Sequence, residues 1–355
     1  MKIVEIDNYS DFLGLEKEWN ILLERCEHSI FSTWEWLSTW WKYFGSNQRL
    51  ILLLATEKDH IIGIAPLMYS TRKIHGLHRG KVSFIGTPHT DYNDFIIAGK
   101  TEECIRMFIE YLNRLPEKWI YIELTEIPEN SKSIPTLSKL SKALKPSSIC
   151  PYKQLPKSPS AFLDSLGRNM RRNLRRYMEK AKKNFKVAFS DYSNVESCTE
   201  GMHLLFKLHQ KRWELRGSPG AFANTSFRNF HLEIAKIFAK KGRLGLFLLK
   251  LSDEPAAAIY GFKDQTKFYG YLSGFDPNYS EYSVGNLLIA HVMENCIREG
   301  LSEFDFMRGG EEYKGLWKTQ LRRNQSVEIP RSSLCSTLYW LYKKVWNPYF
   351  NKIFP

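Results

Sequence analysis

Acidic, phenolic and cationic side chains gather in one stretch near the end of the sequence. Asp305 lies in the run Glu303 to Met307, which reads as a short strand, and a charged turn follows it. A buried carboxylate can accept a proton, a phenol can donate one, and an ammonium can hold a phosphate. The stretch is therefore a candidate site for proton transfer beside a phosphorylated ligand. Its candidate residues are Asp305, Arg308, Glu311, Glu312, Tyr313 and Lys314.

Two interpretations of Asp305 stay open. Phe304 and Phe306 flank it in the strand, so its side chain points away from theirs. The carboxylate either faces a cleft, where burial would raise its pKa and make it a base, or pairs with Arg308 or Arg212 and holds the shape of the site.

A segment upstream is suited to a phosphate. The residues from Lys267 to Leu272 alternate like a strand, and a polar loop leads from them into a helix expected over 285–300. A strand, a glycine-bearing turn and a helix start place several N–H groups and the positive end of a helix dipole together. In the alternative interpretation, Gly285 only relieves crowding in an ordinary strand-helix-strand unit. The candidate phosphate contacts are Ser283, Val284, Gly285 and Asn286.

A basic helix is expected over residues 165–183. Leu166, Met170, Leu174, Met178 and Ala181 recur at a spacing of three to four, so the helix buries one apolar stripe and exposes its cations. These cations attract phosphate: that of a cofactor, of tRNA, or of an anionic lipid or glycan surface. A solvated helix without a ligand is the remaining alternative. Arg168, Arg171 and Arg172 lie at its head.

Bulk composition favours anionic partners and a reducing compartment. The 355 residues carry 51 basic and 38 acidic side chains, a formal net charge of +13. Six cysteines lie far apart with no pair at metal-ligand spacing, so we expect neither a zinc site nor a disulfide framework. The start of the sequence shows no secretory signal, and no apolar run is long enough to span a membrane.

Element order predicts two α/β domains in tandem. Strands are expected near 50–56, 61–69 and 81–85, followed by a helix at 102–115 and a strand at 119–124. The second half repeats this order: strands at 244–251, 256–262 and 267–272, the helix from Gly285 and the strand at Glu303. The predicted domains are 1–150 and 151–330, separated within a segment rich in Ser, Lys and Pro, with an aromatic and basic tail at 331–355.

In the first half, tryptophans and a polar motif attract attention. Four tryptophans between Phe31 and Phe44 are either a stacking platform for a ring-shaped substrate or core packing. The motif Asp91-Tyr92-Asn93-Asp94 either binds an amine or forms an Asx turn.

The order of these residues resembles a known family. The pattern GFDPxYxxYxxGxLL, then a helix ending in Gly, then FDFxRGxxxYKxxW, is similar to the C-terminal signature of the CelD-like branch of the GNAT acyltransferases, which are related to the FemAB transferases. Further matching segments are the head of the basic helix, Arg212 with Trp213, FSTWEWLSTWWKYFG from Phe31, and DYND. The resemblance thus covers nearly the whole chain, and its C-terminal block is the most specific part.

The resemblance implies two tandem GNAT-like domains, each a mixed, mostly antiparallel sheet flanked by helices. It implies an acetyl-CoA or other acyl-CoA donor, no metal, and an amine acceptor. Asp305, Glu312 and Tyr313 would be catalytic, with Tyr313 protonating the departing thiolate. Lys314, Arg168 and Arg172 would add to the phosphate contacts at 283–286. The implied acceptor contacts are Asp91, Tyr92, Asp94, Arg212, Trp213, Tyr271 and Arg308.

One departure keeps the donor open. The pyrophosphate loop of typical GNAT proteins looks like a leading cationic or amide residue followed by more than one small residue. In this sequence, residues 282–287 read Tyr-Ser-Val-Gly-Asn-Leu, with a single glycine and no leading cation. We expect an N-acyltransferase for an amino sugar or another cell-envelope or exopolysaccharide precursor. The alternatives are a FemAB-like transferase that uses aminoacyl-tRNA and a non-catalytic subunit that binds glycan or membrane. We expect a cytoplasmic location, and the tail leaves contact with the inner face of the membrane open.

Overall fold

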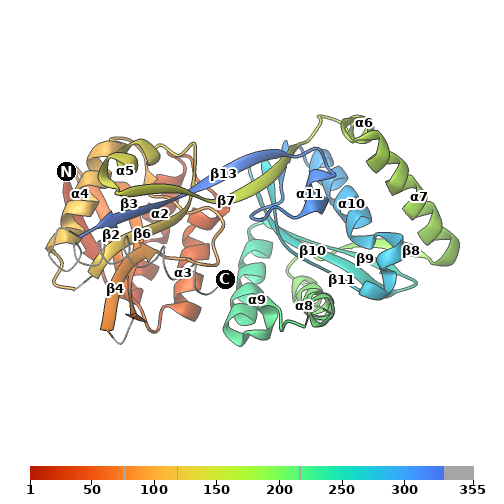
Figure 1. The fold of residues 1–355 in the computed structure, drawn as a ribbon, viewed down its shortest axis with the longest axis horizontal. Coiled ribbons are helices and arrows are strands. Elements are labelled where there is room, and N and C mark those ends of the chain that lie inside the picture. Colours follow the sequence, from red (N-terminus) through yellow and green to blue (C-terminus); the bar gives the residue numbers. More distant parts are fainter. Residues whose placement is uncertain (75–76, 118, 216, 332–355) are drawn as a thin grey trace, which may run out of the picture. The chain divides into compact units, whose positions relative to one another are not determined.

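The structure, a computed structural model, describes residues 1–74, 77–117, 119–215 and 217–331. The chain packs into two compact units: Met1–Ser148 together with the segment from Arg323, and Ile149–Arg322. Each unit has a sheet with helices on both faces, which confirms the α/β class (Figure 1). The tail at 332–355 lies outside the described residues. No helix of the described part is long and apolar enough to cross a membrane.

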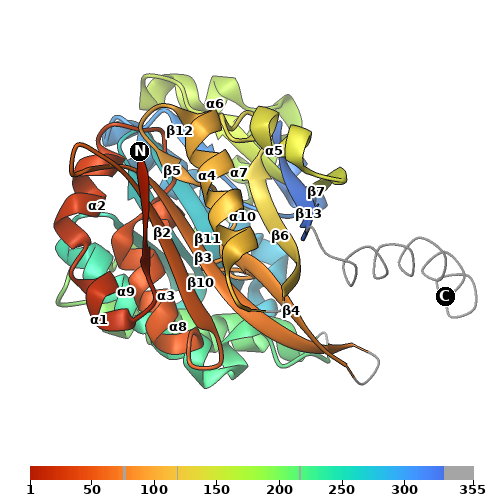
Figure 2. The same ribbon diagram turned by 90° about the vertical axis from the view of Figure 1, so that its left-hand side faces the viewer.

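The first unit surrounds its sheet with five helices in the described residues. They are α1 (Tyr9–Leu13), α2 (Glu16–Leu23), α3 (Trp34–Phe44), α4 (Thr101–Arg114) and α5 (Ile134–Leu140). The strands are β1 (Lys2–Ile6), β2 (Arg49–Glu57), β3 (His60–Ile74), β4 (Leu77–Phe84), β5 (Ile96–Ile97), β6 (Trp119–Pro128) and the first part of β7 (Ala143–Gln154). Helices α1 to α3 lie on one face and α4 with α5 on the other (Figure 2).

The tryptophan-rich helix α3 is part of the core of this unit. Trp36 and Trp40 are buried, and their indole N–H groups donate to Thr90 Oγ1 at 3.1 Å and His89 Nδ1 at 3.0 Å. These bonds tie α3 to the loop after β4. The core-packing interpretation therefore holds for Trp36 and Trp40.

The second unit contains six helices in the part of the chain that the structure describes. They are α6 (Phe162–Ser165), α7 (Arg168–Asn184), α8 (Cys198–Glu214), α9 (Thr225–Lys240), α10 (Val284–Arg298) and α11 (Glu312–Gly315). Its strands follow the order β7, β12 (Glu303–Asp305), β11 (Lys267–Phe275), β10 (Glu254–Asp264), β9 (Leu244–Leu251), β8 (Val187–Asp191). Strand β13 (Gln320–Pro330) begins in this unit, and its residues from Asn324 pair with β6.

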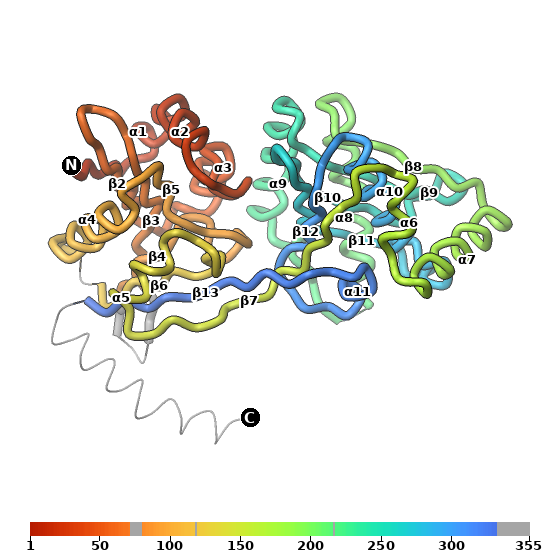
Figure 3. The backbone as a smooth tube through the Cα atoms, turned by 90° about the horizontal axis from the view of Figure 1, so that it is seen from above, coloured from red at the N-terminus to blue at the C-terminus, as the bar shows by residue number. Residues whose placement is uncertain are grey.

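Opposite faces of the second sheet carry different helices. Helices α8 and α9 pack on one face, and α7 with α10 pack on the other, where α7 lies beside α10 (Figures 1 and 3). On that face Phe268 of β11 stacks on Phe304 of β12 with ring centroids 5.1 Å apart. The face of the sheet that packs against α10 also carries a cavity where this helix begins.

Candidate functional site

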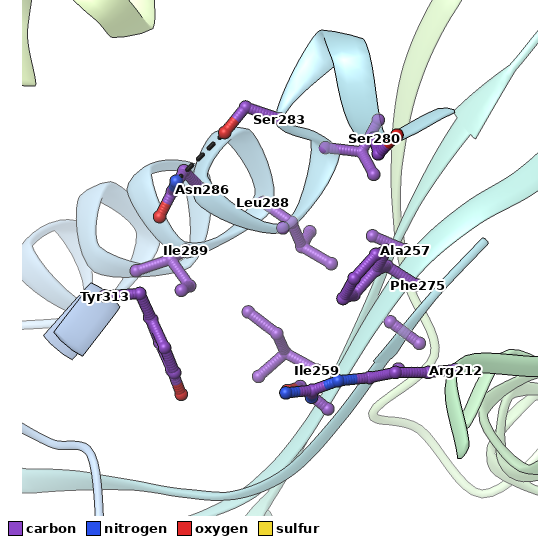
Figure 4. A pocket seen from close by; sticks show the side chains of 15 residues that line it. Arg212, Ala257, Ile259, Phe275, Ser280, Ser283, Asn286, Leu288, Ile289 and Tyr313 are labelled. Carbon is purple, nitrogen blue, oxygen red and sulfur yellow. Dashed lines mark hydrogen bonds between the residues drawn. The ribbon is translucent and has the colours of Figure 1, made fainter. Parts of the chain in front are cut away.

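A cavity of about 260 Å³ lies in the second unit where α10 begins. We call it the α10 cavity. Its walls are residues 257–259 of β10, 273–275 of β11, and 283–286 with Leu288 and Ile289 of α10. Single side chains from other elements complete it: Ser280, Arg212 and Tyr313 (Figure 4). The lining is apolar except at Ser273, at the head of α10 and at these added residues.

The cavity opens where two parallel strands separate. Strand β12 pairs with β11 only over Lys267–Tyr269, although β11 continues to Phe275. Beyond Tyr269, no strand among the described residues pairs with that edge of β11. An unpaired strand edge offers N–H and C=O groups to an extended, amide-bearing ligand.

A bulge in β11 turns side chains at this point. Between the pairs Tyr260 with Leu272 and Phe262 with Tyr269, the register shifts, so Gly270 and Tyr271 both face the single residue Gly261. Residues beyond the bulge therefore point to opposite faces from those expected by simple alternation. Tyr271 packs on His231 of α9, with ring centroids 5.1 Å apart, and does not line the α10 cavity.

The head of α10 is built to receive an anion. Its N-cap residue Ser283 has left-handed φ and ψ of 50° and 43°, and no side chain caps the first-turn N–H groups. The Ser283 hydroxyl instead accepts a hydrogen bond from Asn286 Nδ2 at 2.9 Å. Uncapped N–H groups and the positive end of the helix dipole thus face the cavity.

Gly285 leaves open space at this helix head. A Cβ at this position would meet no atom within 4 Å, and the residue has ordinary helical backbone. Packing therefore does not require a glycine here, although glycine costs a helix about 1 kcal/mol relative to alanine. The interpretation that Gly285 relieves crowding within the fold is wrong. A glycine at this position would allow a ligand to approach the helix backbone closely.

Tyr313 supplies a phenol to the cavity. Burial raises its pKa to about 12, with a further increase from the negative charge of Glu311 and a decrease from Arg212. The phenol is therefore protonated at neutral pH and can donate a proton. The Arg212 guanidinium, 5.4 Å from the centroid of the Phe275 ring, points into the same part of the cavity (Figure 4).

Lys314 lies behind this wall instead of in it. Its buried ammonium donates to the carbonyl oxygens of Met307, Arg308 and Gly309 at 3.2, 2.8 and 3.2 Å, and pairs with Glu311 at 2.9 Å. These hydrogen bonds and this ion pair direct the ammonium toward the loop 307–311 and not toward the cavity. The structure thus gives Lys314 a role in shaping the segment before Tyr313, in place of the expected phosphate contact.

Asp305 is held in an ion pair away from the cavity. Its fully buried carboxylate accepts from Arg322 Nη1 at 2.8 Å and from the Met307 N–H at 2.8 Å. Arg322 also contacts Glu303 at 3.1 Å. The geometry favours the shape-holding alternative, and it adds Arg322, a contact that the sequence did not reveal because β13 lacks a regular apolar alternation.

Other predicted residues of the second unit lie outside the cavity lining. Glu312 is exposed at the start of α11, and Arg308 is half-buried. Trp213 donates from Nε1 to His209 Nε2 at 3.0 Å. Arg168 and Arg172 line a separate groove on α7. Of the predicted residues, the structure brings together Ser283, Val284, Gly285, Asn286, Arg212 and Tyr313.

The polar motif of the first unit is buried within that unit. Asp91 and Tyr92 are 6% and 4% exposed, and the Asp91 carbonyl accepts from Asn324 at 2.9 Å. Asp94 accepts from the hydroxyls of Ser131 and Ser133, and burial raises its pKa to about 6. These contacts fasten the loop to β6, β13 and the start of α5, so an exposed amine-binding surface is not seen at these residues.

Comparisons with known proteins show which proteins this chain is similar to. Residues 168–315 match the family model described as "Acetyltransferase (GNAT) domain". The solved structure of FemX is 12% identical, with a TM-score of 0.65 over 96% of this chain and 99% of that chain. L-PGS from Bacillus licheniformis is 11% identical, with a TM-score of 0.57 over 92% and 96%. A tandem GNAT protein from the clavulanic acid biosynthesis pathway is 9% identical, with a TM-score of 0.53 over 94% and 99%.

At such low sequence identities, these likenesses show that the folds are similar and nothing further. They confirm two tandem GNAT-like domains, and the family match places the α10 cavity inside the acetyltransferase domain. A sequence search of the curated proteins gives no match.

Proposed function

Since this chain is an acyltransferase with a GNAT domain over residues 168–315, we propose that it is an N-acyltransferase with an acyl-CoA donor. The proposed acceptor is the amine of an amino sugar or of another cell-envelope or exopolysaccharide precursor, as in the CelD-like branch. We further propose a cytoplasmic location.

The head of α10 is the observation that carries the proposal. Uncapped N–H groups and open space at Gly285 suit the pyrophosphate of coenzyme A. From there the unpaired edge of β11 runs along the cavity, where it can bind the amide groups of the pantetheine arm. A cavity of about 260 Å³ has room for this arm with a short acyl group.

The proposed reaction is direct transfer without a covalent enzyme intermediate. The acceptor amine, once deprotonated by water, attacks the thioester carbonyl carbon, and a C–N bond forms. The tetrahedral intermediate collapses with cleavage of the C–S bond, and the leaving thiolate takes a proton from the Tyr313 hydroxyl. The nitrogen of the new amide then loses its extra proton, which returns through water to the Tyr313 phenolate. Arg212, which points into the same part of the cavity, stabilises negative charge during the transfer. Asp305 has a supporting role through its pair with Arg322.

Donor choice is tested by thermal shift and by product analysis. Acetyl-CoA should raise the melting temperature and, with a panel of amino sugars, should yield free thiol and an acetylated product detected by mass spectrometry. Binding of aminoacyl-tRNA with no response to acyl-CoA would instead support the FemAB-like alternative. A protein that responds to neither donor would be a non-catalytic binding subunit, and the proposal would be wrong.

A further inference from the structure

The N-terminal half of α7 carries a cationic groove that is distinct from the α10 cavity. The groove has a volume of about 520 Å³. It is lined by Arg168, Arg171, Arg172, Arg175, Arg176 and Glu179. None of these residues lines the α10 cavity. The groove is therefore a second candidate site, lined separately from the α10 cavity.

The charges of the groove lie at the unfavourable end of the helix. Helix α7 begins at Arg168, follows the N-cap Gly167, has no side-chain cap, and has no acidic residue in its first turn. Cations there face the positive end of the helix dipole, and Arg168, Arg172 and Arg176 repel one another at a spacing of four. Asp164 compensates only in part, through a pair with Arg171 at 2.7 Å. Both effects oppose folding of this helix turn, and a bound anion would reverse both.

Two lysines from other segments add positive charge near the same helix head. Lys153 of β7 is only 4% exposed, and its ammonium donates to the Ser165 carbonyl at 3.3 Å. Burial lowers the pKa of Lys153, and the charge of Lys318 lowers it further. Lys318 is close to the N-cap, because its Cε lies 3.6 Å from where a Cβ on Gly167 would be. Positive charge from three segments thus gathers at the head of α7: from β7, from the residues after α11, and from α7 itself.

Neighbouring side chains narrow the class of ligand. Met170, Leu174 and Ala181 are buried in the core, so α7 has no apolar face to insert into a bilayer. Among the residues that the structure describes, no aromatic side chain lines the groove, and Arg176 covers the nearby Tyr177 ring at 4.8 Å from its centroid. Single-stranded nucleic acid is held by base stacking as well as charge, so this surface is poorly suited to it. Arginine forks match phosphate oxygens in pairs.

We propose that the cationic groove binds phosphate ester groups, at a site separate from the α10 cavity. The groups belong either to a soluble ligand, such as a pyrophosphate-linked molecule, or to the headgroups of anionic lipids at a membrane surface. In both cases the arginines contact phosphate oxygens from solvent, and the uncapped N–H groups of α7 add to the attraction.

The test compares two double variants of the same helix in the full chain. Arg168→Gln with Arg172→Gln removes two charges from the groove. Lys182→Gln with Lys183→Gln removes two exposed charges from the end of α7, outside it. Sodium pyrophosphate is titrated calorimetrically, and sedimentation is measured with phosphatidylcholine vesicles with and without phosphatidylglycerol. Melting temperatures verify that both variants fold.

The groove variant should bind the effective probe about a hundredfold more weakly, or about tenfold for each arginine, and the control should stay near wild type. Pyrophosphate binding that is weakened in the groove variant identifies a soluble ligand of the groove, whereas pyrophosphate binding that is unchanged in that variant belongs to the head of α10 and would overturn the proposal. Binding to the anionic vesicles alone identifies lipid. An equal loss in both variants would mean diffuse charge attraction and would overturn the proposal. Binding of neither probe would also overturn it.

Discussion

At the scale of single residues, Tyr313 is the group on which the proposed chemistry depends. Replacing it by Phe removes only the hydroxyl, so the cavity wall should remain and the donor should bind as before. Since the phenol is the proposed acid, kcat should fall about a hundredfold. Steady-state kinetics with acetyl-CoA measure this. A variant with unchanged kcat would exclude Tyr313 as the acid.

A neighbouring residue, His209, predicts a pH dependence of stability. Burial, together with the smaller effect of the Arg212 charge, lowers its pKa to about 4, whereas an unfolded histidine titrates near 6.5. As the pH falls from about 6.5 to 4, the unfolded state takes up a proton that the folded state does not, so stability decreases, on the order of 3 kcal/mol. His209→Gln should remove this part of the slope in urea unfolding at several pH values. An unchanged slope would contradict the assignment.

At the scale of elements, the ion pair between Asp305 of β12 and Arg322 of β13 holds the strand beside the cavity in place. Asp305→Asn removes a carboxylate that contacts the half-buried Arg322, whose guanidinium also contacts Glu303. We expect a loss of about 3 kcal/mol in the free energy of unfolding, measured by urea titration. The exposed Glu312→Gln is the control and should change it by less than about 0.5 kcal/mol. Full stability with lost activity would instead identify Asp305 as the base.

The sequence predicts elements well where apolar periodicity is strong. Helix α7 was expected at 165–183 and runs over Arg168–Asn184, because its apolar stripe is regular. Strand β13, with the sequence QLRRNQSVEIP, was missed, since its charged residues find partners that are distant in the chain. The site divides in the same way. Gly285 and Tyr313 were recognised by type and context, whereas Ala257 and Ile259 look like any core residue, and only the separation of β11 from β12 makes them walls.

At the scale of the whole molecule, the net charge of +13 is consistent with two anion sites of different construction. The α10 cavity offers backbone N–H groups in a mostly apolar setting, and the cationic groove offers exposed arginines. Binding at the groove should therefore weaken steeply with salt, while binding at the cavity should weaken less. Titrations of acetyl-CoA and pyrophosphate at low and high salt measure the two slopes. Equal slopes would contradict this division.

The proposed function requires that the phosphates of the acyl-CoA donor lie against Gly285. Gly285→Leu places a side chain in the open space there without a clash at its Cβ, so the protein should fold with undiminished stability. Gly315→Leu, at another glycine with open space outside the cavity, is the matched control. Calorimetric titration with acetyl-CoA should show binding weakened at least about tenfold in Gly285→Leu and unchanged in the control. Wild-type affinity in Gly285→Leu would contradict the account.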